Sequence, residues 1–76
     1  MKWKAPIETT IAGHKYREGD RLVYATYDQF RDRDDSEVVR VCAIYVHRET
    51  GEKRIYVTDD TGVKFRAILE KIIRRA

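Results

Sequence analysis

The sequence predicts a mainly β (α+β) fold: a small, twisted antiparallel sheet of four to five strands, or a small barrel, with one C-terminal amphipathic helix. Two observations carry this prediction. As far as Asp60, runs rich in β-branched and aromatic residues alternate with short polar segments, as in antiparallel sheets joined by tight turns. After Gly62 the apolar residues recur with a helical period instead. Because a chain of 76 residues makes one domain at most, residues 1–76 are expected to form a single small β-barrel-like domain.

The N-terminal half is expected to contain two strands joined by a turn. Residues 7–16 ("IETTIAGHKY") predict a strand that Gly13 interrupts, and residues 21–30 ("RLVYATYDQF") predict a second strand suited to a half-buried, pleated surface. Between them, "REGD" predicts a turn in which Gly19 takes a positive φ. Residues 31–37 ("RDRDDSE") are expected to form a polar loop, because their charges cannot enter a core.

The longest β-type run, Val38 to Arg48, is the predicted central strand. Both of its alternating sets of residues are largely apolar, which is typical of a strand covered on both faces. Glu49 to Glu52 then predicts a tight hairpin turn with Gly51 in the left-handed conformation, and Arg54 to Thr58 returns antiparallel to the central strand.

A C-terminal helix is predicted from five apolar residues spaced at i, i+3, i+4, i+7 and i+8: Phe65, Ile68, Leu69, Ile72 and Ile73. Asp60 or Thr61 is the expected N-cap. This apolar stripe should cover the central strand. The alternative is a final strand through Val63 to Ala67, with only the end of the chain helical.

The composition indicates neither catalysis nor a metal site. A single cysteine and two distant histidines provide neither a disulfide nor a structural zinc site. Cys42 falls within an apolar strand, where a thiol stays protonated and inert, and the acidic residues of 31–37 lack the pattern of a calcium loop. We therefore expect a protein that is not an enzyme and binds no cofactor.

The hydropathy of the sequence indicates in which cellular compartment the protein is expected. No apolar run approaches the ~20 residues needed to cross a bilayer. Residues 1–4 lead into no signal-peptide core, and a soluble, cytoplasmic protein is the expectation.

Basic residues are concentrated toward the C-terminus. The chain carries a formal net charge of +3, yet residues 61–76 alone hold five Lys or Arg and one Glu. Such a cluster attracts polyanions, since neutralised phosphates release counterions. The predicted hairpin and helix place the candidate phosphate contacts at Arg48, Lys53, Arg54, Lys64, Arg66, Lys71, Arg74 and Arg75.

The aromatic residues divide into expected core and expected contacts. Tyr24 and Tyr27 lie on opposite faces of their strand, because their spacing is odd. We expect Tyr24 and Tyr45 in the core or at its rim. Tyr27 and Tyr56 are the candidate aromatic contacts, since exposed rings can stack on bases.

Two stretches carry a resemblance to known families. "EGDRLVYATYD", followed by "RVCAIYVHRETGEKRIYV", resembles Tudor and related Src-homology-3-like barrels, over Tyr16 to Asp59. That resemblance implies recognition of methylated lysine or arginine by an aromatic cage, with Tyr27 and Tyr56 as walls. The layout is also similar to the small chromatin proteins of crenarchaea, which are charged barrels ending in a helix. "AIYVHRETGEKRIYVTDDTG" resembles the arm-binding domain of phage integrases. The last two resemblances imply DNA binding.

Two classes of function remain open. The first is a small nucleic-acid-binding module that contacts phosphates, with duplex DNA favoured, through the C-terminal hairpin and basic helix. The second is a non-catalytic protein-interaction module, such as an adaptor or inhibitor encoded by a phage or mobile element, which docks through a sheet edge and the aromatic strand 21–30. A net charge of +3 with 13 acidic residues is modest beside strongly basic DNA-binding domains, and so it leaves both classes open.

Overall fold

The computed structural model describes all 76 residues as strands, turns and one short 3-10 helix. In chain order the elements are β1 (Trp3–Lys4), β2 (Glu8–Ile11), β3 (His14–Arg17), β4 (Arg21–Asp28), β5 (Arg33–His47), β6 (Lys53–Thr58), β7 (Lys64–Arg66), η1 (Leu69–Lys71) and β8 (Ile72–Arg75).

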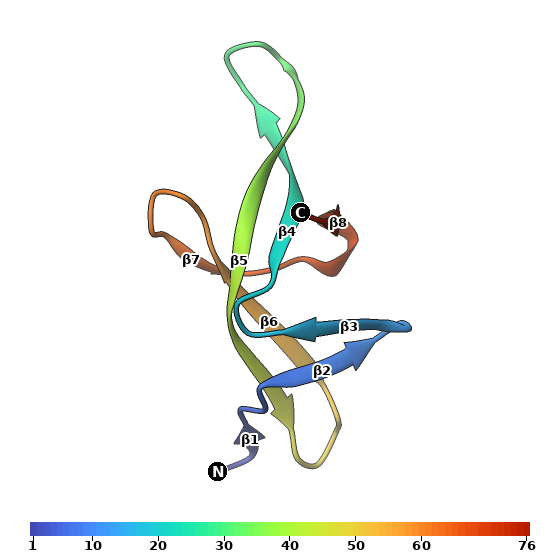
Figure 1. Ribbon diagram of the computed structural model, residues 1–76. Coiled ribbons are helices and arrows are strands. Elements are labelled where there is room, and N and C mark those ends of the chain that lie inside the picture. Colours follow the sequence, from blue (N-terminus) through green and yellow to red (C-terminus); the bar gives the residue numbers. More distant parts are fainter.

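The main sheet is antiparallel, in the order β7-β6-β5-β4-β8, with β1 also paired to β5. A separate hairpin, β2–β3, crosses beside it (Figure 1). The molecule is elongated, with extents of 43 × 25 × 19 Å, and β5 runs along most of its length in the figure. The mainly β, antiparallel prediction is confirmed. The sheet does not close into a barrel, because β7 and β8, at its two ends, do not pair with each other.

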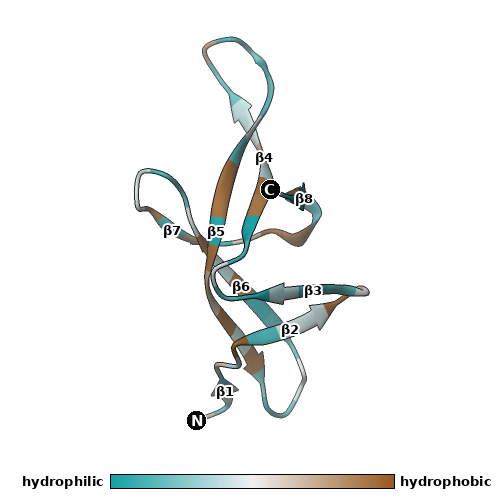
Figure 2. Cartoon of the chain, viewed as in Figure 1, coloured by the Kyte–Doolittle hydropathy of each residue, from teal (hydrophilic) through white to brown (hydrophobic).

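The core lies on one face of the sheet, here called the inner face. Its largest fully buried side chains come from β4, β5 and β6: Leu22, Val39, Val41, Ile44, Ile55 and Val57. The brown segments of Figure 2 mark these apolar stretches at the middle of the sheet. Tyr16 from β3, Tyr24 from β4 and Ala67 complete the buried cluster, so the core placement of Tyr24 is confirmed. Each fully buried Val, Leu or Ile side chain stabilises the fold by about 1.5–3 kcal/mol through removal of apolar surface from water.

A β-bulge in β5 decides which residues face the core. The register with β6 shifts between Val41 and Ala43, next to Cys42. Val39 and Val41 are buried before the bulge and Ile44 after it, so the buried set changes from odd to even positions. The central position of this strand is confirmed. Its two alternating sets do not each keep to one face, as the sequence suggested, because the extra residue at the bulge reverses the alternation.

The predicted first strand is a two-stranded hairpin. Residues 7–16 divide into β2 and β3, which meet at Ala12 and Gly13, both with positive φ of 50° and 81°. Positive φ at both central residues of a two-residue turn matches the twist of the strands it joins. The glycines expected in the next two turns are confirmed, with φ of 91° at Gly19 and 73° at Gly51. Gly51 N–H also donates to the carbonyl oxygen of His47, at 2.9 Å.

The polar segment 31–37 is not the expected loop. From Arg33 it belongs to β5 and pairs with β4, where Tyr27 lies opposite Asp34 and Asp28 opposite Arg33. Its charged side chains from Arg31 to Asp35 are exposed, since this end of the hairpin projects beyond the core, and Glu37 is half-buried (Figure 1). The charges therefore exclude the segment from the core without preventing strand pairing.

The prediction of a C-terminal helix is wrong. Its place is taken by β7, the single 3-10 turn η1 and β8, which pairs with β4. Neither Asp60 nor Thr61 caps a helix; instead, the Asp59 carboxylate accepts bonds from the N–H groups of Thr61 and Val63 and holds a turn. Three members of the predicted stripe, Phe65, Leu69 and Ile72, do pack against the core. The β-branched Ile72 and Ile73 suit the strand β8, and the pairing of β8 with the distant β4 prevails over the local helical period.

We predict that Ile44→Ala destabilises the protein by ~2–5 kcal/mol, because Ile44 is fully buried and its truncation leaves a cavity. Val38→Ala on the same strand is the matched control: Val38 is 40% exposed, and its loss should cost less than about 1 kcal/mol. Urea denaturation of both variants measures the difference. Equal losses would contradict the assigned core face.

Candidate nucleic-acid interface

The face of the sheet opposite the core carries aromatic and basic side chains. On β6, Ile55 and Val57 point into the core, so Arg54, Tyr56 and Thr58 point the other way. Residues directly opposite each other on paired strands share a face. Tyr45 is opposite Arg54, Arg66 is opposite Tyr56, and Lys64 is opposite Thr58. We call this surface the outer face, defined by Trp3, Tyr45, Arg54, Tyr56, Lys64 and Arg66.

Tyr45 is on this face because of the bulge in β5. Its side chain is 38% exposed and lies against the ring of Tyr56, with centroids 5.6 Å apart and an interplanar angle of 83°. The expected position of Tyr45 in the core or at its rim is wrong, since the reversed alternation after Cys42 points Ile44 inward and Tyr45 outward. Tyr56, a candidate contact, lies half-buried beside it.

Trp3 joins the outer face through the pairing of β1 with β5, which sets it opposite His47. The indole and imidazole rings meet edge to face, with centroids 4.9 Å apart. The Arg54 guanidinium lies 4.5 Å from the centroid of the Trp3 ring, a cation–π arrangement. The β5–β6 hairpin and the distant strand β1 thus bring Trp3, Tyr45 and Tyr56 together around Arg54.

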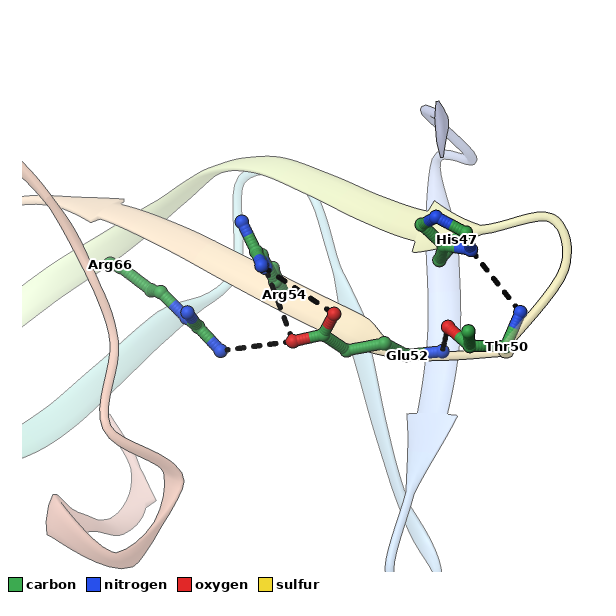
Figure 3. A network of polar contacts seen from close by, with 5 residues as sticks. All are labelled: His47, Thr50, Glu52, Arg54 and Arg66. Atoms are coloured by element: carbon green, nitrogen blue, oxygen red, sulfur yellow. Dashed lines mark hydrogen bonds and ion pairs between the residues drawn. The ribbon is translucent and has the colours of Figure 1, made fainter. Parts of the chain in front are cut away.

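One carboxylate, Glu52, serves both arginines of the outer face (Figure 3). Glu52 Oε1 lies 3.3 Å from Arg54 Nε and 3.5 Å from Arg66 Nη2. The hairpin turn positions Glu52: His47 Nδ1 accepts from the Thr50 N–H at 3.2 Å, and Thr50 Oγ1 accepts from the Glu52 N–H at 3.2 Å. Partly exposed pairs of this kind contribute about 0–1 kcal/mol, so the guanidiniums lose little if they exchange this carboxylate for another anion.

Two other predicted cations have structural roles. Lys53 Nζ donates to the carbonyl oxygen of Thr10 at 2.5 Å, and the Arg75 guanidinium donates to the carbonyl oxygen of Lys15. These contacts attach the β2–β3 hairpin to the rest of the molecule from both of its edges. Arg75 also pairs with Asp20 at 3.8 Å. Neither side chain is free for phosphate without giving up these bonds.

The predicted single basic surface is divided between two edges of the sheet. Arg66 and Lys64 belong to β7, whereas Arg74 and Arg75 belong to β8 at the opposite edge. At about 4.8 Å per strand, roughly 19 Å of sheet separates them. The remaining candidates, Arg48 in the β5–β6 turn and Lys71 in η1, are exposed outside the outer face.

Tyr27 and Tyr56 do not form one site. Tyr27 lies opposite Asp34 near the end of the β4–β5 hairpin, and its hydroxyl donates to Asp32. Tyr56 lies opposite Ala43, beyond the bulge. The two cage walls that the Tudor resemblance implies are therefore apart.

Sequence reasoning missed Arg21 and Arg40, which are exposed and lie opposite each other on β4 and β5. Their alternation with Leu22, Val39 and Val41 is the signal that could have placed them outward. They adjoin a hollow of about 530 Å³ that Glu37, Asp59 and Asp60 also line. Because these acids would repel a polyanion, we confine the candidate interface to the part of the outer face from Trp3 to Arg66, with Lys64 at its margin, opposite Thr58.

Two acids of this hollow, Glu37 and Asp59, have shifted pKa values. Burial raises the pKa of Glu37, and the charges of Asp59 and Asp60 raise it further. The hydrogen bond from the Thr61 hydroxyl lowers the pKa of Asp59, at 2.6 Å between the oxygens.

Comparisons with protein-family models, with curated proteins and with solved structures find no match to this chain. The structure contains no helix long and apolar enough to span a membrane, and no group of three or more His, Cys, Asp or Glu side chains placed to hold a metal ion.

We predict that Glu37→Gln raises the Tm at pH 7. A carboxyl whose pKa is higher in the folded state favours folding below its ordinary pKa, and this contribution is lost as the pH rises through the raised value. Glutamine mimics the protonated form of the side chain. The gain in Tm should therefore shrink and vanish as the pH falls below 4.5, the ordinary pKa of a glutamate. Thermal melts of both proteins from pH 3 to 7 measure the difference, and comparing the two cancels the opposite contribution of Asp59. A constant gain across that range would contradict the raised pKa.

Proposed function

We propose that this protein is a small nucleic-acid-binding module, with duplex DNA its favoured ligand, that holds phosphates on the outer face. The observation that carries the proposal is the placement of Arg54 and Arg66 opposite the two paired rings, Tyr45 and Tyr56, with Lys64 two residues from Arg66 on the same strand. Guanidiniums suit phosphate because their planar donors can bind two oxygens at once.

Phosphate contact is favoured over reading of bases. The cations of the outer face project from a sheet surface, and the β4–β5 hairpin that projects from the molecule carries four aspartates against two arginines: Asp28, Asp32, Asp34 and Asp35 against Arg31 and Arg33. An acidic hairpin would be repelled from a DNA groove. Binding through phosphates positions a protein without specifying sequence, so we propose little sequence preference.

The strand connections agree with the small-barrel resemblance. Strands β4 to β7 follow one another through the sheet, and after the 3-10 turn the last strand, β8, returns to pair with β4. We propose that the chain is related in architecture to Src-homology-3-like barrels, with the outer face as the binding surface in place of a basic helix.

The first expected result concerns salt. Log affinity for duplex DNA should fall linearly with log salt, at about −0.9 per phosphate neutralised, and Lys64→Ala/Arg66→Ala should reduce that slope by roughly two units. The control is Arg31→Ala/Arg33→Ala, which removes two positive charges from the β4–β5 hairpin and should leave the slope unchanged. Fluorescence anisotropy with duplex, single-stranded DNA and RNA of equal length measures all three ligands. Absence of binding at ~50 mM salt, or equal slopes for the two double variants, would reject the proposal.

The second expected result is a gain of affinity. Glu52→Gln removes the carboxylate that competes with phosphate for Arg54 and Arg66, and it should tighten DNA binding by roughly two- to five-fold, the equivalent of a partly exposed ion pair. Glu49→Gln in the same turn makes the same change of charge without touching either arginine. If both variants bind equally tightly, the effect is one of net charge alone, and the two guanidiniums are not the site.

A further inference from the structure

The end of the β4–β5 hairpin exposes a large apolar side chain. Residues 25–36, here called the finger, project beyond the core (Figure 1). Phe30 at its turn is fully exposed, at 103%, and Tyr27 is 54% exposed. An aromatic ring held out on a projecting turn gains no stability from its own fold, and isolated anchors of this kind are typical of binding hot spots.

The finger holds Phe30 outward in an ordered turn. Asp28 Oδ1 accepts from the N–H groups of Phe30 and Arg31, at 3.0 and 3.2 Å, and its Oδ2 lies 3.8 Å from Arg31 Nε. The Tyr27 hydroxyl donates to Asp32 across the same turn. Because these bonds order the turn beforehand, a partner that takes up Phe30 need not bear the full entropic cost of ordering it.

The molecule also contains an apolar hollow that no side chain fills. The groove, between the β2–β3 hairpin and β8, has a volume of about 400 Å³ and is mostly apolar. Ile11, Leu69, Ile72 and Ile73 line it, together with two arginines, Arg74 and Arg75, and one acid, Glu70. Its size falls in the range of ordinary ligand pockets, which is ample for one aromatic ring.

The groove cannot be filled by the finger of the same molecule. Leu22 lines the groove and lies on β4 with Asp28, so the strand itself carries the finger away. At about 3.3 Å per residue, these two residues are roughly 20 Å apart. Any docking of Phe30 in a groove of this kind is therefore intermolecular.

Charge selects the partner. The finger carries four aspartates and two arginines, whereas the groove is lined by two arginines and one glutamate. Arg75 already pairs with Asp20, so Arg74 is the cation left to face the finger. The same aspartates oppose insertion of Phe30 between DNA bases, because they would face phosphates. Anchor and hollow thus match in size, apolar character and charge, and both belong to this chain.

We propose that the protein self-associates head to tail, with Phe30 of one copy docked in the groove of a second copy and the finger aspartates facing Arg74. Such a heterologous contact leaves a free finger at one end and a free groove at the other, and so it builds chains or closes into a ring. The 21–30 segment, one of the two expected functional surfaces, thereby has a defined partner. The contact is independent of the outer face, so its failure and the failure of DNA binding are separate results.

The test uses two variants, each of which disables one side of the contact. Phe30→Ser removes the anchor and Ile73→Asp places a charge in the groove; Ile73 is 57% exposed, so folding should tolerate the change. Sedimentation velocity from about 10 μM to 1 mM should show concentration-dependent assembly of the wild type and a monomer for each variant, since a contact this small is weak. Gln29→Ser, in the same turn, is the control and should assemble like the wild type.

Mixing the two variants supplies the decisive result. Ile73→Asp retains a finger and Phe30→Ser retains a groove, so an equimolar mixture should form a 1:1 heterodimer that cannot grow further. If Ile73→Asp fails to fold, Arg74→Glu takes its place as the groove variant. Adding Asp34→Lys/Asp35→Lys, which reverses the charges of the finger, should then restore the assembly that Arg74→Glu abolishes.

A wild type that stays monomeric at 1 mM, a Phe30→Ser variant that still assembles, or a mixture that forms no heterodimer would each overturn the proposal. If the wild type and both variants are monomeric and Phe30→Ser loses affinity for DNA, the self-association proposal is overturned. The result would instead favour a Phe30 side chain that inserts between DNA bases.

Discussion

The fold depends on one strand, β5, which pairs with β4 along its first part and with β6 along its second, and with β1 at its end. The first part of β5, up to Arg40, pairs with β4, and the part from Arg40 onward pairs with β6. The bulge beside Cys42 lies just after this change of partner. There the Gly19 N–H donates to the Val41 carbonyl oxygen and the Val41 N–H donates to the Asp20 carbonyl oxygen, both at 2.8 Å. These bonds keep buried backbone groups satisfied where the ladder is irregular.

The reversal of alternation at the bulge also creates the candidate interface. Were the strand regular, Tyr45 would follow Val39 and Val41 into the core and Ile44 would face outward. With the extra residue, Ile44 fills the core and Tyr45 meets Tyr56 on the outer face. A single backbone irregularity therefore serves packing and surface chemistry together.

The basic residues have unequal roles, although they look alike in the sequence. Lys53 and Arg75 satisfy carbonyl oxygens along the edges of the β2–β3 hairpin and stabilise its attachment. Arg54 and Arg66 share one weak carboxylate partner at the surface, and Lys64 beside them is exposed. A side chain that holds the fold together cannot be exchanged for a phosphate contact without loss of stability. Exposed or loosely paired cations can make a phosphate contact without that loss. The candidate site therefore centres on the outer face rather than on the whole set of cations.

By itself, the sequence determined the local features: the β4 to β6 strands, the turns at Gly19 and Gly51, the core position of Tyr24 and a cationic C-terminal third. Each follows from the residue's own backbone preference or from its alternation with near neighbours. Only the tertiary structure decided that residues 64–75 form strands, that Tyr45 faces outward, and that Arg66 and Arg75 lie at opposite edges of the sheet. These outcomes depend on which distant strand a segment pairs with and on where an extra residue enters the ladder. The free energy of such long-range pairing is spread over partners far apart in the chain, such as Tyr24 and Ile72 or Arg21 and Arg40, and no local period records it.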